Sequence, residues 1–90
     1  MIHVSKSAKF LRSYKRLIKG RADLQKEFSE KIVIFMANPY DPSLGTHKLK
    51  GKLRHSWGFS LTHGLRVVFM FVDDHTVILE DIGTHDDVYY

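Results

Sequence analysis

The sequence has 90 residues, of which 43% are hydrophobic and none is cysteine, and it carries 14 lysines and arginines against 10 acids. Such a chain favours one compact domain over residues 1–90, and it excludes a disulfide framework and a thiolate metal site. Because there is neither the apolar segment of a secretion signal nor an apolar run of membrane-spanning length, we expect a cytoplasmic protein.

Charge is divided unevenly along the chain. Residues 1–66 hold all 14 basic residues and only 4 acids, a net charge of +10, whereas residues 67–90 hold 6 acids and no lysine or arginine, a net charge of −6. A basic body favours polyanionic partners such as RNA, DNA or the ribosome, because each neutralised phosphate releases counterions. A solvated, solubilising surface explains the same composition equally well.

The first half of the chain is predicted to be helical, after a short strand at residues 2–4. Apolar residues recur at spacings of three to four over residues 10–18 and 24–35, which is the period of an amphipathic helix. Ser5 or Ser7 can cap the first helix and Gly20 can end it, whereas the second should end before Asn38 and Pro39. The two helices, joined at residues 19–22, should form a hairpin.

The second half of the chain alternates with the period of strands. We expect Trp57, Phe59 and Leu61 on one face of a strand, a turn at residues 63–64, a central strand over residues 65–72, and a last strand over residues 76–82. The sequence therefore predicts an α+β fold. A short N-terminal strand and a helical hairpin pack on one face of an antiparallel sheet of about four strands.

Three histidines stand at the boundaries of these elements, namely His47, His63 and His85. Metal-independent RNA cleavage needs a base for the ribose 2′-OH, an acid for the leaving 5′-oxygen, and a cation beside the phosphate. Histidine suits both proton transfers near neutral pH, and Arg66 suits the third role because a guanidinium can meet two phosphate oxygens at once. Tyr89 can stack on an unpaired base.

Each of these residues also has a purely structural interpretation. A histidine in a turn is more often a surface residue than a catalyst, and Asp86, beside His85, can simply cap a helical turn. Arg66 interrupts an apolar strand, where a charge needs a partner or a ligand. The histidines lack the short spacings of metal ligands, so we expect no metal and no cofactor. The remaining basic candidates for contact with phosphate are Lys48, Lys50, Lys52 and Arg54. The alternation of the three lysines can instead mark a solvated edge strand that is protected from aggregation.

Three segments in this order carry a family resemblance: HKLKG at residues 47–51, LRVVF at 65–69 and IGTHDDVY at 82–89. On these segments, and across nearly its whole length, the chain resembles the RelE/ParE superfamily of bacterial toxins, and within it the YafQ-like branch of ribosome-dependent mRNA interferases. The resemblance implies a RelE-like fold and the toxin of a type II toxin–antitoxin system. Such a toxin enters the A site of the 70S ribosome, cuts mRNA there, and is neutralised by a cognate antitoxin.

The resemblance also implies roles for individual residues. His47, His63 and His85 match the histidines of the YafQ-like active site, Tyr89 its C-terminal aromatic residue, and Arg66 an arginine that many relatives place on the central strand. The family pattern has an acidic residue shortly after the second histidine, where this chain has GLR. Our hypothesis is that His85 belongs to the acid–base pair and that His47 or His63 is its partner.

Two other functions fit the same fold. A ParE-like toxin acts on DNA gyrase, and such toxins generally lack the histidines found here. A non-catalytic module that binds RNA or the ribosome needs only the basic body of the chain.

Overall fold

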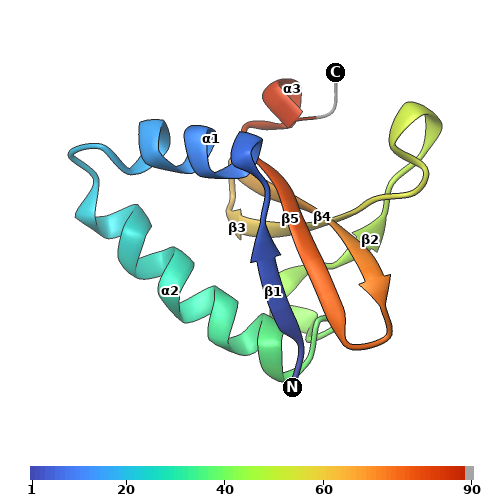
Figure 1. Ribbon diagram of the computed structural model, residues 1–90. Helices are drawn as coiled ribbons and strands as arrows, with labels where there is room; N and C mark the ends of the chain where they lie inside the picture. Colours follow the sequence, from blue (N-terminus) through green and yellow to red (C-terminus); the bar gives the residue numbers. More distant parts are fainter. Residues whose placement is uncertain (89–90) are drawn as a thin grey trace.

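The computed structural model describes residues 1–88, with two helices packed on one face of a five-stranded sheet (Figure 1). In chain order the elements are β1 (His3–Lys6), α1 (Ala8–Ile18), α2 (Ala22–Ala37), β2 (His47–Lys48), β3 (Trp57–Thr62), β4 (Leu65–Asp73), β5 (Thr76–Gly83) and α3 (His85–Val88), with single 3₁₀ turns at Pro42–Leu44 and Gly51–Leu53. The predicted α+β class and the helical hairpin are confirmed.

The strand order in the sheet is β1-β5-β4-β3-β2. Strands β2 to β5 are antiparallel, as predicted, but β1 is a fifth strand that pairs parallel to β5, with His3 opposite Thr76. The sheet is therefore mixed. The parallel pair arises because the helical hairpin carries the chain from β1 at one edge of the sheet to β2 at the other, so that β1 is free to pair with the last strand.

The helix boundaries follow from local capping. Of the two serines predicted to cap α1, Ser7 does so: its Oγ accepts a hydrogen bond from the backbone N–H of Phe10 at 3.0 Å. The same hydroxyl donates to the carbonyl of Glu80 at 2.9 Å, which ties the start of α1 to β5. Beyond the end of α1, Gly20 has φ +69°, which an L side chain rarely adopts. Helix α2 ends at Ala37, before the asparagine–proline pair.

The main core lies between the helices and the sheet. Phe35 of α2 is fully buried and stacks on Phe59 of β3 at 4.9 Å between ring centroids, and it meets Phe69 of β4 edge-on at 4.8 Å. The residues of β3 predicted to share a face do share it. The buried members of this core are Phe10, Phe28, Phe35, Leu44, Phe59, Leu61, Val67, Phe69, Val77, Leu79 and Ile82.

The opposite side of the sheet, which we call the outer face, carries a smaller apolar cluster. Val68 of β4 alternates with the core residues and so points away from α1 and α2. It packs with Leu49, Leu53 and Val88, of which the first two come from the segment after β2 and the last from α3. The cluster therefore holds the segment after β2 and helix α3, which are distant in sequence, against strand β4.

The alternation of three lysines allowed an edge strand through Lys48, Lys50 and Lys52. The structure shows that the strand ends at Lys48, so this interpretation is wrong for Lys50 and Lys52. Strand β2 has only two residues. Gly51 has φ +66°, a left-handed conformation that breaks the extended chain, and a 3₁₀ turn follows it.

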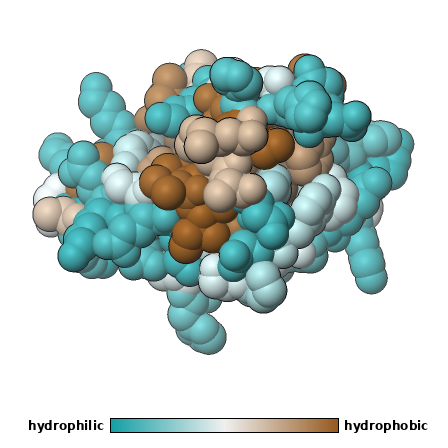
Figure 2. Space-filling view, turned by 90° about the horizontal axis from the view of Figure 1, so that it is seen from below, coloured by the Kyte–Doolittle hydropathy of each residue, from teal (hydrophilic) through white to brown (hydrophobic). Residues whose placement is uncertain are grey.

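The end of the molecule that carries the N-terminus presents apolar side chains to solvent. Figure 2 views this end and shows a hydrophobic patch surrounded by hydrophilic side chains. A hollow of about 600 Å³ opens here between the N-terminus, the end of α2 and the β4–β5 turn, and Ile2, Met36, Tyr40 and Phe71 contribute to its lining. Among residues 1–88, no helix is both long and apolar enough to cross a membrane.

The central position of Phe35 makes a stability prediction. Phe35→Ala leaves a cavity between α2 and the sheet, and we expect it to lower the free energy of unfolding by about 3–5 kcal/mol. Val33→Ala, on the same helix but at a side chain 66% exposed, should change it by less than about 0.5 kcal/mol. Urea denaturation followed by circular dichroism measures both. A loss below about 1 kcal/mol for Phe35→Ala would contradict this account of the core.

Candidate active site

His47 and His85 line the same pocket on the outer face of the sheet. The pocket has a volume of about 290 Å³, and its other lining residues are Lys48, Leu49, Lys50 and Leu53. The two histidines come from β2 and from the first residue of α3, and the small cluster around Val68 brings these segments together. The structure thus unites two of the three histidines that the sequence analysis singled out.

The ring of His47 has a defined contact. Its Nδ1 lies 3.0 Å from the carbonyl oxygen of Gly45. A carbonyl oxygen can only accept, so Nδ1 must carry the hydrogen in this contact, and the neutral ring then has its lone pair on Nε2. In β2, His47 stands opposite Gly58 of β3, and directly paired residues project to the same side of a sheet. The ring is exposed to solvent.

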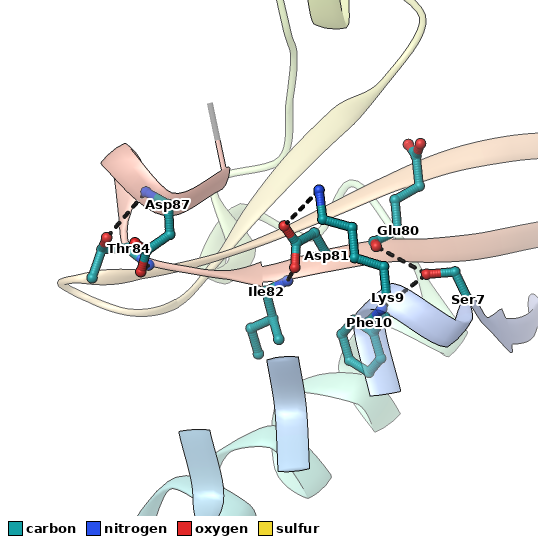
Figure 3. Close-up of polar contacts among 8 residues, drawn as sticks. All are labelled: Ser7, Lys9, Phe10, Glu80, Asp81, Ile82, Thr84 and Asp87. Atoms are coloured by element: carbon teal, nitrogen blue, oxygen red, sulfur yellow. Dashed lines mark hydrogen bonds and ion pairs between the residues drawn. The ribbon is translucent and has the colours of Figure 1, made fainter. Parts of the chain in front are cut away.

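His85 begins α3, and its side chain is 67% exposed. The carboxylate of Asp86 lies 3.7 Å from its Nδ1, close enough for an ion pair when the ring is protonated. The interpretation of Asp86 as the helix cap is wrong. The cap is formed by Thr84, whose Oγ1 accepts from the backbone N–H of Asp87 at 3.3 Å, while Asp87 Oδ2 accepts from the backbone N–H of Thr84 at 3.2 Å (Figure 3).

Arg66 lies on β4, between β3 and β5 in the sheet, and it is not among the residues that line the pocket. It stands opposite Ser60 in β3 and Gly83 in β5, and it shares the outer face with Val68 two residues later. Its Nη1 donates to Ser60 Oγ at 2.6 Å. Within residues 1–88 no carboxylate pairs with this half-buried guanidinium. The charge that the sequence analysis expected to need a partner or a ligand therefore has a neutral hydroxyl as its protein partner in this part of the chain.

The structure does not bring every predicted residue to the pocket. His63 lies exposed in the β3–β4 turn and is not among the lining residues. Lys52 and Arg54 are exposed in and after the second 3₁₀ turn and also lie outside the lining. Tyr89 falls outside the residues that the structure describes.

Basic side chains give the rim of the pocket a positive character. Lys50 is exposed there, and the ammonium of Lys48 lies 6.0 Å from the centre of the Trp57 ring, at the outer limit of a cation–π contact. No group of three or more potential metal ligands occurs among the described residues 1–88. The arrangement offers two imidazoles and nearby cations, which suits proton transfer beside a phosphate.

Sequence reasoning missed four residues that hold the site in place. The Thr84 and Asp87 pair has a readable signal, because a threonine followed three residues later by an acid is typical of a helix start. Ser56 and Glu80 have none: the buried hydroxyl of Ser56 donates to Glu80 Oε1 at 2.6 Å across a long sequence separation. That bond ties the segment carrying Lys50 and Leu53 to β5.

Comparisons with known proteins agree with this fold. No family model matches the chain, and no curated protein sequence matches it either. Among solved structures, a metal-bound toxin from Helicobacter pylori is 27% identical, with a TM-score of 0.80 over 98% of this chain and 99% of that one. YafQ from E. coli is 14% identical, with a TM-score of 0.81 over the whole of both chains. A YoeB/ParE toxin from Agrobacterium tumefaciens is 14% identical, with a TM-score of 0.78 over 93% of this chain and 99% of that one.

The agreement extends over nearly the full length of each of these chains, and it includes the toxin to which the sequence analysis pointed. The chain therefore shares its fold with these toxins, YafQ among them, which is the fold that the sequence resemblance predicted.

Proposed function

We propose that this protein is the toxin of a toxin–antitoxin pair and that it inhibits translation by cutting mRNA on the ribosome. The observation that carries the proposal is the meeting of His47 and His85 in one pocket beside cationic side chains. Two histidines and a cation are the set that metal-independent cleavage by the ribose 2′-OH requires.

The contact made by His47 supports a role for it as the base, with His85 as the acid. His47 Nε2, which carries the lone pair, removes the proton of the ribose 2′-OH as that oxygen attacks the adjacent phosphorus. The bond between phosphorus and the 5′-oxygen breaks, and protonated His85 gives its proton to that oxygen. The products are a 2′,3′-cyclic phosphate and a free 5′-hydroxyl, so atoms and protons balance without a metal or an added reactant.

The neighbouring groups would stabilise charge and hold the RNA. Arg66, whose partner among residues 1–88 is a neutral hydroxyl, would face the extra negative charge of the transition state. Lys48, Lys50, Lys52 and Arg54 would contact phosphates along the strand. Tyr89 would stack on a base next to the cut, a role that the sequence alone suggests.

Two partners follow from this function. A solved structure of the E. coli DinJ–YafQ toxin–antitoxin complex contains a chain that is 16% identical to this protein. The two chains align with a TM-score of 0.71 over 99% of this chain. By that likeness we infer a cognate antitoxin for this protein. The basic excess of residues 1–66 fits the second partner, the A site of the 70S ribosome, where RNA surrounds the bound mRNA.

Removal of either pocket histidine should abolish most of the cleavage. Each of His47→Ala and His85→Ala is expected to lower the rate about 10²- to 10⁴-fold, because each removes one of the two proton transfers. Primer extension on an mRNA in a translating extract measures the cuts. His75→Ala, an exposed histidine in the β4–β5 turn, is the matched control and should cleave like the unaltered protein.

His63 gives a second comparison in the same assay. Since its side chain lies outside the pocket, His63→Ala should lose less activity than either pocket variant. Undiminished cleavage by His85→Ala would contradict the proposed mechanism. Two results together would instead favour a ParE-like toxin. The variant that lacks both pocket histidines would still arrest growth, and the protein would inhibit the supercoiling activity of purified gyrase.

Arg66 and the exposed basic residues should fail in different ways. Arg66→Lys keeps the charge but loses the planar pair of donors, so kcat should fall about 10-fold or more with little change in KM. The Lys52→Ala, Arg54→Ala double variant should raise KM and flatten the dependence of KM on salt, because it removes phosphate contacts without touching the pocket. Steady-state kinetics at 50 and at 200 mM salt separate the two effects. An unchanged kcat for Arg66→Lys would remove Arg66 from the mechanism.

A further inference from the structure

We propose that Gly83, Thr84 and Asp87 form a lock that fixes the direction of the His85 side chain, and that they are positioning residues of the RNA cleavage proposed above, on which this inference rests. The juxtaposition behind it is at the end of β5, where Thr84 and Asp87 face one another (Figure 3). None of the three residues lines the pocket of His47 and His85.

Helix α3 cannot hold its own orientation. It has four residues, a length at which an isolated helix is unstable, because helix nucleation fixes several residues for one hydrogen bond. Val88 is its one buried residue. Contacts at the start of the turn therefore add to the hold that Val88 gives at its end.

The two hydrogen bonds between Thr84 and Asp87 supply those contacts. Thr84 Oγ1 accepts from the Asp87 backbone N–H, and Asp87 Oδ2 accepts from the Thr84 backbone N–H. The pair therefore satisfies two backbone donors of the helix start in a reciprocal way. His85 lies inside the ring of chain that these bonds close, so the bonds fix the backbone conformation of the residue that carries the imidazole.

Gly83 completes the lock because it has no side chain, which lets α3 pack directly against β5. It is buried, and a Cβ added to it would lie 2.9 Å from Asp87 Cβ and 3.4 Å from Val88 Cγ1. Asp87 therefore packs directly on the backbone of β5, at the residue that stands opposite Arg66 in β4. Any side chain at position 83 would push α3 away from the sheet and carry His85 with it.

The chain offers close variants for the test. Asp87→Ala removes the acceptor of the lock, whereas Asp87→Asn keeps an oxygen that can accept from Thr84. Thr84→Val removes the hydroxyl, whereas Thr84→Ser keeps it. Asp74→Ala is the matched control, because it removes one exposed acid from the β4–β5 turn at the far end of the sheet. Thermal unfolding of each variant checks that it is folded.

We expect Asp87→Ala and Thr84→Val to lower kcat of mRNA cleavage about 10- to 100-fold, because an error of about 1 Å in a reacting group costs rates of that order. KM should stay within about twofold, since the RNA contacts lie elsewhere. Asp87→Asn and Thr84→Ser should recover most of kcat. Unchanged kcat in folded Asp87→Ala and Thr84→Val proteins would overturn the lock.

Gly83→Ala tests the packing independently of the hydrogen bonds. It should lower kcat by a similar factor, and the Gly83→Ala, Asp87→Ala double variant should lose little more than either single variant, because both act on the position of α3. Fully multiplicative losses would show that the two residues act separately, and would contradict a single lock.

Nuclear magnetic resonance separates the lock from the function on which it rests. In Asp87→Ala the ring resonances of His85 should shift and the amide of Thr84 should lose its protection from hydrogen exchange, while the ring resonances of His75 stay in place. Those changes in a protein that cuts no RNA would sustain the lock and reject the proposed nuclease. Their absence in an active enzyme would reject the lock alone.

The lock also predicts a pH response. Hydrogen bonds from the side chain and then the backbone of Thr84 hold the pKa of Asp87 below its ordinary value of 3.8. A carboxylate with a lowered pKa keeps its contacts above the ordinary value and loses them as the pH falls through the lowered one. The Thr84 amide shift, followed from pH 6 to pH 2, should therefore change with a midpoint below 3.8. A midpoint at or above 3.8 would show that the carboxylate gains nothing from Thr84.

Discussion

The packing of Leu49, Leu53 and Val88 on Val68 is the contact on which the site depends. The main core lies on the other face of the sheet, so this cluster is the apolar contact that holds the segment after β2 and the last helix on the outer face. Both segments are short, and neither has enough regular structure to hold itself. A few apolar side chains thus convert two separate histidines into a pair.

Those parts of the structure that rest on local chemistry could be predicted from the sequence. The cap at Ser7, the end of α2 before Asn38 and the alternation of β3 are decided by residues close to one another in the chain. The parallel pairing of β1 with β5 could not be predicted, because nothing near either strand encodes the choice of a distant neighbour. The same reason applies to the bond between Ser56 and Glu80.

The candidate site was predictable in its residue types and only partly in its membership. The sequence places three histidines at the ends of elements, and the fold selects His47 and His85 for one pocket while leaving His63 in a turn outside it. Several acids of the last quarter of the chain have structural partners: Asp73 accepts from the backbone N–H of His75, Asp81 pairs with Lys9, and Asp87 accepts from the backbone N–H of Thr84. Much of the negative charge of residues 67–90 is therefore bound up in contacts that hold the fold together.

The parallel pairing of β1 with β5 affects the order in which the fold can form during synthesis of the chain. Since His3 stands opposite Thr76, the sheet remains open at β1 until β5 has left the ribosome, and α3 follows β5. A nascent chain that stops before β5 has neither a partner for β1 nor a second histidine beside His47. The pocket shared by His47 and His85 is therefore complete only after β5 and α3, the last elements in the described part of the chain, have been made.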